Sequence, residues 1–308
     1  MKLRLLKRNE IDDQRWDERI ESAPQGLPYA FSWYLDVVAD RRWGALVSED
    51  YQQVMPLPWN RKLLGMRQVY APFLVQQLGV MGPEVSSEMV QDFLQQIPLA
   101  YRRVVLRLNE RNEIEGAPGF HLQPRTNLLL DLSSGYEMLW NGYDKSLRRR
   151  LRKAKNRLRV TPSEDAAAVV RLYHSQLEKR LNLGDAFYTR AEHLMSTALE
   201  KEKGILLQVS SETELLATGF FLHSHGRLIN LFGASTDEGR RLHAMHRMLD
   251  YLIESHAGQP MWLDFEGSEV PSIASFFRSF GAERRTYSIA QRDLLPGWWR
   301  LLEKRVIR

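Results

Sequence analysis

The stretch that decides the fold of this 308-residue chain lies near its C-terminus. Residues 262–268 read WLDFEGS, and residues 275–282 read SFFRSFGA. The first pattern predicts a strand that ends in two carboxylates and a glycine turn, and the second predicts a short helix closed by a glycine. We therefore expect a polar turn at the strand end, where Asp264 and Glu266 lie beside a cation such as Arg278.

Two interpretations of these carboxylates fit the sequence equally. In the first, they form a structural ion pair that holds the turn. In the second, they belong to a polar site, where one of them accepts a proton during a reaction or only orients Arg278.

Upstream of this turn, the positive charge of the chain is concentrated in one segment. Residues 145–159 read KSLRRRLRKAKNRLR, with nine Lys or Arg and no acidic residue. The whole chain carries a net charge of only +5, so this segment accounts for its basic character. Apolar residues recur at helical spacing within the segment, which predicts a helix with one apolar face formed by Leu147, Leu151, Ala154 and Leu158.

This basic helix allows three interpretations. It can be a solvated surface helix, as charge runs often are. It can bind a phosphate-containing ligand, because cations without interleaved acids forgo stabilising i,i+4 ion pairs and repel one another unless an anion is present. It can also contact a nucleic-acid backbone in a salt-dependent manner. Composition alone does not separate these interpretations.

The fold class follows from the alternation of helix and strand patterns along the chain. Residues 103–108 alternate as a strand does, residues 126–132 read as a buried strand, and residues 240–255 read as a helix. The predicted class is therefore α/β, in the mixed α+β sense. The length exceeds one hydrophobic core, so we expect two domains, 1–133 and 134–308.

Several functional classes lose their usual signals. The chain has no cysteine, which excludes disulfides, thiolate zinc sites and a cysteine nucleophile. The motifs of P-loop NTPases, zincins, α/β-hydrolases and dinucleotide-binding folds are absent. His243 with His246, and His223 with His225, have ligand-like spacing but lack a third ligand in context, so no metal is expected.

The sequence also bears on location. Its first residues lack the apolar core of a signal peptide, and no apolar run approaches the roughly 20 residues that a membrane span requires. We therefore expect a soluble, cytoplasmic protein without a membrane span.

Four motifs, in this order, resemble the FemAB-like group of the GNAT acyltransferases. Residues 145–154 stand where that family has Ser-x-x-x-Arg-x-x-x-x-Lys-Ala. Gly-Ala-Ser at 233–235, Asp-Phe-Glu-Gly at 264–267 and Phe-Arg-Ser-Phe-Gly at 277–281 resemble the family's Gly-Ala-Ser, Asp-Phe-x-Gly and Phe-Lys-x-x-Phe-Gly. Each motif is weak alone, but the order and spacing agree across residues 140–290.

The resemblance implies two tandem GNAT-like domains, each a mixed, mostly antiparallel sheet flanked by helices, with a substrate cleft at or near their junction. It also implies transfer of an acyl or aminoacyl group from acyl-CoA (such as acetyl-CoA) or from aminoacyl-tRNA to an acceptor. The acceptor would be a small-molecule amine or a phosphate-containing acceptor. A different class of function also fits: a degenerate GNAT fold that serves as a noncatalytic tRNA- or RNA-binding or interaction protein.

The resemblance also suggests residue roles. Asp264, Glu266 and Arg278 are the candidate catalytic residues, and Phe277 with Arg278 would lie near the acyl carbonyl or the donor's terminal groups. The remaining candidates would bind the phosphates of the substrate, and they are Lys145, Arg148, Arg149 and Arg152.

Two departures from the family pattern stand out. Arg278 replaces a lysine, which exchanges a point charge for a planar fork. The segment 235–241 has one glycine and two acids, unlike the glycine-rich loop that holds the CoA pyrophosphate at a helix N-terminus in GNAT enzymes. The second departure speaks against CoA binding in the usual manner.

Overall fold

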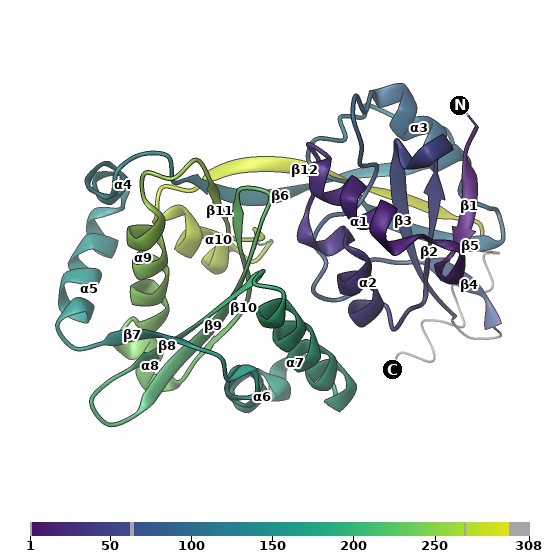
Figure 1. The fold of residues 1–308 in the computed structure, drawn as a ribbon. Coiled ribbons are helices and arrows are strands. Elements are labelled where there is room, and N and C mark those ends of the chain that lie inside the picture. Colours follow the sequence, from purple (N-terminus) through teal and green to yellow (C-terminus); the bar gives the residue numbers. More distant parts are fainter. Residues whose placement is uncertain (1, 62–64, 268, 296–308) are drawn as a thin grey trace. The chain divides into compact units, whose positions relative to one another are not determined.

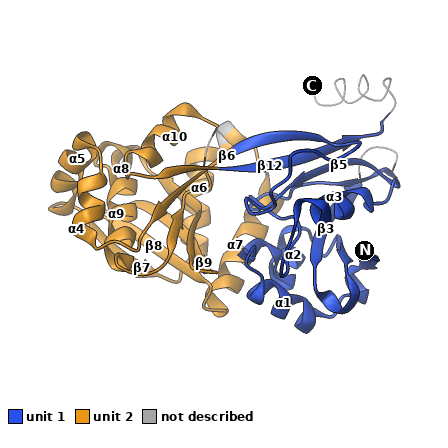
Figure 2. Ribbon diagram, turned by 90° about the horizontal axis from the view of Figure 1, so that it is seen from above, with its two compact units in different colours: residues 1–125, 286–308 blue, residues 126–285 orange. Residues whose placement is uncertain are grey.

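The computed structural model describes residues 2–61, 65–267 and 269–295 (Figure 1). Its contacts divide the chain into two compact units (Figure 2). Unit 1 combines residues 1–125 with 286–308, and unit 2 comprises residues 126–285.

The strands of unit 1 lie side by side in the order β1, β2, β3, β4, β5, β12. Neighbouring strands are antiparallel, except β4 and β5, which are parallel. Their bounds are β1 Arg4–Lys7, β2 Trp43–Val47, β3 Val54–Arg61, β4 Arg67–Val69, β5 Tyr101–Arg107 and β12 Glu283–Asp293. The helices are α1 Asp13–Ser22, α2 Ser32–Val38 and α3 Ser87–Gln95, with short 3-10 turns at Arg8–Glu10, Pro28–Ala30 and Glu49–Tyr51.

Local sequence explains where two of these helices begin. The Asp12 carboxylate accepts a hydrogen bond from the Arg15 backbone N–H at 3.1 Å and so caps α1. The Ser86 hydroxyl accepts from the Met89 N–H at 3.2 Å and caps α3. The core of this unit includes Trp16, which is fully buried against the ring of Trp43, with 5.2 Å between their centroids.

In unit 2 the strand order is β6, β11, β10, β9, β8, β7. All neighbours are antiparallel except β10 and β11. The strands are β6 His121–Asp131, β7 Arg159–Ser163, β8 Gly204–Ser210, β9 Leu215–Ser224, β10 Arg227–Ser235 and β11 Trp262–Asp264. The helices are α4 Tyr136–Gly142, α5 Lys145–Lys155, α6 Ala166–Leu181, α7 Asp185–Glu200, α8 Asp237–Arg241, α9 Ala244–His256 and α10 Pro271–Arg278.

Helices cover both faces of the unit 2 sheet, because successive residues of a strand face opposite sides. At Gly219 of β9, an added Cβ would lie 2.4 Å from the Met248 sulfur, so this position faces α9. The next residue, Phe220, lies against Gly204 beside α7. The predicted mixed α/β class with mostly antiparallel sheets and flanking helices is confirmed.

Candidate functional site

The strands β10 and β11 diverge soon after they meet. Their parallel register covers three residue pairs, from Arg227 opposite Trp262 to Ile229 opposite Asp264. Strand β11 then ends, while β10 runs on to Ser235 and is irregular in its pairing with β9 between Asn230 and Phe232. The second half of β10 therefore has no β11 partner. Where a strand has no neighbour, its backbone N–H and C=O groups on that side need other partners.

A buried ion pair joins β10 to β11 in the segment where the two strands are paired. Arg227 Nη1 lies 2.9 Å from Asp264 Oδ2, and only 1% of Asp264 is exposed. The same carboxylate accepts hydrogen bonds from Asn127 Nδ2 at 3.1 Å and from the Glu266 backbone N–H at 2.8 Å. This arrangement matches the interpretation of a structural ion pair at the turn, with Arg227 as the cation.

Of the other two predicted residues of this turn, Glu266 is bonded to Asp264 through its backbone N–H, and Arg278 does not pair with Asp264. Glu266 is half-buried and has a φ of 57°, a left-handed conformation that costs a non-glycine residue free energy. Arg278 is exposed at the end of α10, and its side chain makes no hydrogen bond or ion pair to any described residue.

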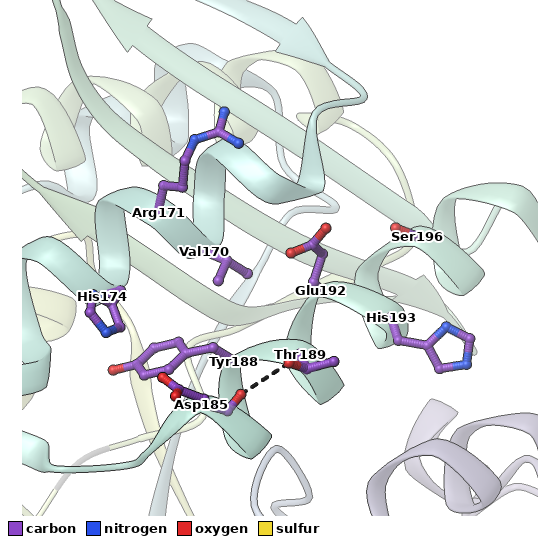
Figure 3. Close-up of a pocket in the computed structure, with 9 residues that line it drawn as sticks. All are labelled: Val170, Arg171, His174, Asp185, Tyr188, Thr189, Glu192, His193 and Ser196. Carbon is purple, nitrogen blue, oxygen red and sulfur yellow. Dashed lines mark hydrogen bonds between the residues drawn. The ribbon is translucent and has the colours of Figure 1, made fainter.

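An aromatic layer covers the diverging half of β10 on the side of α6 and α7. The ring of Phe232 stacks on Tyr173 with 4.0 Å between centroids and on Phe187 with 6.1 Å. On the outer side of the same two helices lies a surface cavity of about 610 Å³ (Figure 3), where the Thr189 hydroxyl donates to the Asp185 carbonyl oxygen at 3.1 Å. No sequence motif predicted either feature.

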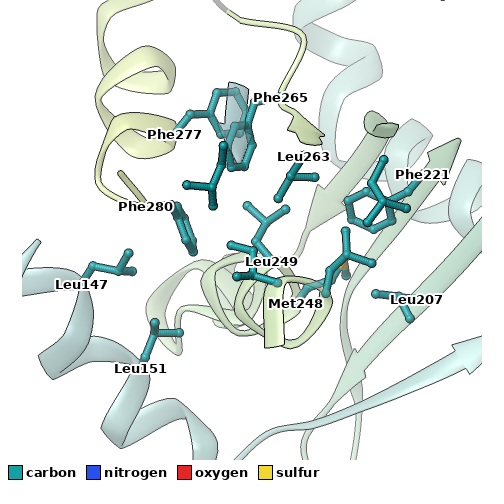
Figure 4. Packing of buried hydrophobic residues seen from close by; sticks show 14 of the residues in the cluster. Leu147, Leu151, Leu207, Phe221, Met248, Leu249, Leu263, Phe265, Phe277 and Phe280 are labelled. Carbon is teal, nitrogen blue, oxygen red and sulfur yellow. The ribbon is translucent and has the colours of Figure 1, made fainter. Parts of the chain in front are cut away.

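The predicted apolar face of the basic helix is confirmed. Leu147 and Leu151 of α5 are fully buried, and they pack into the core formed with α9 and α10 (Figure 4). Phe277 belongs to this core as well, since it is 8% exposed and stacks on Phe265 with 4.7 Å between ring centroids. Phe277 thus fastens α10 to the end of β11.

The structure brings the start of the basic helix to the end of α10. The Asp144 N–H donates to the Ser279 carbonyl oxygen at 2.9 Å. Lys145 follows the donor in sequence and Arg278 precedes the acceptor, so these two predicted residues flank one hydrogen bond. The other predicted anion-binding side chains also lie on α5 and make no ion pair within the described part of the chain: Arg148 is half-exposed, and Arg149 and Arg152 are exposed.

Two further cations of α5 lie beside the N-terminus of α9. Burial, followed by the charges of Arg150 and Lys153, lowers the pKa of His243, the residue that precedes this helix. Burial, His243 and Arg150 lower the pKa of His246 to about 3. Arg150 and Lys153 are three residues apart and so share one flank of α5. That spacing could have singled them out in the sequence.

The N-terminus of α9 suits an anion. His243 is in the left-handed region, with a φ of 64°, and its side chain makes no capping hydrogen bond. The first N–H groups of a helix have no partner within the helix, and the helix dipole favours negative charge there. We call Arg150, Lys153, His243 and this helix end the α5–α9 junction.

The segment that precedes α9 differs from an open phosphate loop. Residues 237–241 form the short helix α8, capped by the Thr236 hydroxyl at 2.9 Å from the Gly239 N–H. A Cβ at Gly239 would lie 2.2 Å from the Leu216 carbonyl oxygen, so this glycine is required for packing against β9. Ion pairs join Asp237 to Arg240 and Glu238 to Arg241.

Two features are absent from the described residues. Within residues 2–61, 65–267 and 269–295, no group of three or more His, Asp or Glu side chains could hold a metal ion. Over the same ranges, no helix has the length and apolar character that crossing a membrane requires.

A family model matches the greater part of unit 2. Residues 142–269 match the family model of the acetyltransferase (GNAT) domain. No curated protein sequence matches the chain.

Solved structures support the same fold. The crystal structure of FemX is similar with a TM-score of 0.69 and 15% identity, over 94% of this chain and 97% of that one. A conserved protein of unknown function from Bacteroides thetaiotaomicron has a TM-score of 0.55 and 9% identity, over 83% and 90% of the two chains. The C-terminal domain of a putative lysylphosphatidylglycerol synthetase from Agrobacterium fabrum has a TM-score of 0.52 and 14% identity, over 91% of each chain. Residues 142–269 thus match a GNAT acetyltransferase domain, and the fold of the chain is similar to that of FemX.

Proposed function

We propose that the chain transfers an acyl or aminoacyl group from a phosphate-bearing donor to an amine. The observation that carries this proposal is the α5–α9 junction, where the charges of Arg150 and Lys153 act on His243 at a helix N-terminus without a side-chain cap. This helix follows the strand that diverges from β11, so phosphates bound at the junction would leave the acyl end of the donor near the diverging strands.

Acyl-CoA and aminoacyl-tRNA both meet this description. In either case the amine nitrogen attacks the carbonyl carbon and a C–N bond forms. The thioester C–S bond or the ester C–O bond breaks, and the amine loses a proton. The chain would contribute by orienting the two reactants, accepting the proton and stabilising the developing oxyanion.

The side chains support different roles in this reaction. Asp264 and Glu266 are the candidates for the proton acceptor, and the oxygens of Asp264 also accept hydrogen bonds from Arg227, Asn127 and a backbone N–H. The donor phosphates would bind at Arg150 and Lys153. The body of a large donor would extend along the predicted anion-binding residues, which are Lys145, Arg148, Arg149 and Arg152.

Arg278 is proposed to bind the terminal groups of the donor. Its replacement should therefore lower turnover but leave the free energy of unfolding almost unchanged. The side chain is exposed and unpaired within the described part of the chain. Arg278→Ala should therefore change the free energy of unfolding by no more than about 0.5 kcal/mol. Turnover should fall about tenfold or more, as expected for loss of a charged hydrogen bond. Wild-type turnover in a steady-state assay would remove Arg278 from the site.

The donor class is tested by ligand-induced stabilisation. The full chain would be melted with acetyl-CoA, longer acyl-CoAs, charged tRNA and uncharged tRNA, at low and moderate salt. A ligand that binds the folded state raises the melting temperature by mass action. A rise with one CoA thioester, or with charged tRNA in preference to uncharged tRNA, followed by transfer to an amine, supports the proposal. Absence of a rise with every donor contradicts it.

One observation favours a second candidate, a noncatalytic RNA-binding protein. Of the nine cations in residues 145–159, only Lys155 forms an ion pair with another described residue. An RNA-binding protein of this kind would bind charged and uncharged tRNA equally, with a strong salt dependence, and would show no transfer.

A further inference from the structure

We propose that Asp250 and Lys155 are positioning residues, which hold the basic helix α5 in the register that places Arg150 and Lys153 at the N-terminus of α9. The inference rests on the proposed function, because it assigns a reason for that register. It concerns residues that lie away from the reacting groups.

A buried polar network joins α5 to α9 and α4. Asp250 of α9 is fully buried, and its carboxylate accepts a hydrogen bond from the Tyr136 hydroxyl of α4 at 2.8 Å. Lys155 Nζ lies 3.4 Å from Asp250, donates to the Tyr136 hydroxyl at 2.9 Å and lies 3.3 Å from Glu254. The same ammonium lies over the ring of Tyr136, 4.9 Å from its centroid. Arg247 Nη1 lies 3.4 Å from Asp250 Oδ2, the oxygen that Lys155 also approaches.

These contacts are directional, whereas the other buried contacts of α5 are not. Leu147, Leu151 and Ala154 fill the core, and apolar burial depends on area rather than on orientation. A slip of one residue would move the helix about 1.5 Å along its axis and turn it about 100°. Such a slip would carry Arg150 and Lys153 away from His243. The ammonium of Lys155, with its defined partners, opposes this slip.

Helix α5 is held at both of its ends, and the buried polar network holds the C-terminal one. At the start of α5, the Asp144 N–H is bonded to the Ser279 carbonyl oxygen at 2.9 Å. At the last residue of the helix, Lys155 is bonded to Tyr136 and paired with Asp250. Arg150 and Lys153 lie between these two fixed points, so their position is determined from both sides.

Stability alone does not account for a fully buried carboxylate at this place. Burial raises the pKa of Asp250, and the Tyr136 hydrogen bond, Lys155 and Arg247 oppose that rise. Replacing a buried ion pair by uncharged groups of similar volume is often neutral for stability, because desolvation offsets much of the attraction. The directional contacts of Asp250 with Tyr136 and Lys155 support a role in setting the register of α5 instead.

The test removes both charges together, as Lys155→Met with Asp250→Asn in the full chain. The net charge is unchanged, and the asparagine oxygen still accepts from the Tyr136 hydroxyl. We expect a melting temperature close to that of the wild type and an affinity for inorganic pyrophosphate about tenfold lower. The pKa of His243, followed by NMR without ligand, should rise, because Arg150 and Lys153 would no longer be held beside it.

A matched control and a rescue sharpen the test. Arg171→Met with Asp165→Asn removes an exposed ion pair of 3.2 Å elsewhere in this unit and should change neither pyrophosphate affinity nor the His243 titration. Lys155→Arg, with Asp250 unchanged, keeps the positive charge and should give the wild-type pyrophosphate affinity and the wild-type pKa of His243. Wild-type affinity and an unchanged His243 pKa in the double variant would overturn the proposal.

The experiment distinguishes failure of the proposed function from failure of the positioning role of Lys155 and Asp250. If the wild type does not bind pyrophosphate, the proposed donor site fails. In that event the ligand-free His243 titration still decides whether Lys155 and Asp250 set the position of α5.

Discussion

Replacing Arg150 and Lys153 together by glutamate should weaken binding of the donor about 100-fold while the protein stays folded. The charges of both side chains act at the N-terminus of α9, where burial, Arg150 and Lys153 lower the pKa of His243. Hydrogen bonds to charged groups contribute about 1.5–3 kcal/mol each, so loss of two cations accounts for a factor of this size. Isothermal titration calorimetry with the donor identified by ligand-induced stabilisation would measure it.

The control variant changes the net charge by the same amount, but on the outer face of α5. Arg149→Glu with Arg152→Glu removes two exposed cations that the sequence analysis assigned to anion binding. For a small donor such as acyl-CoA, this variant should lose only a few-fold in affinity through long-range electrostatics. For tRNA, the loss should be large in both variants, because the polyanion spans the helix. An equal, small effect of both variants would remove α5 from the site.

The second large effect concerns stability. Asp264→Ala should lower the free energy of unfolding by about 3–5 kcal/mol, because it leaves Arg227 as an uncompensated buried charge. Arg227 is 8% exposed, and the pair closes the end at which β10 and β11 meet. Denaturation by urea, followed by circular dichroism, would measure the change.

Asp237→Ala provides the matched control, since its carboxylate is 95% exposed in an ion pair with Arg240. Its loss should cost at most about 1 kcal/mol. If Asp264→Ala retains wild-type stability but abolishes transfer, the structural interpretation of this carboxylate is wrong and a catalytic role takes its place.

The local elements near the site could be predicted because their signals lie within a few residues of one another. The apolar spacing from Leu147 to Leu158 specifies the buried face of α5 through the geometry of the helix alone. The strand, turn and helix between Trp262 and Arg278 likewise follow from neighbouring apolar, glycine and proline positions. The resemblance of these motifs to the FemAB-like group extended this local information to the fold.

What the sequence by itself determined, then, is the kind of each element and the concentration of positive charge on one helix, since both depend on residues close in the chain. Only the tertiary structure decided that the cation at Asp264 is Arg227, 37 residues away, and that Arg150 and Lys153 face α9. It also decided that residues 289–293 of β12 pair with β5 in unit 1. These pairings depend on contacts between distant segments, which form only when the buried apolar faces pack together, and no local spacing encodes which segments will meet.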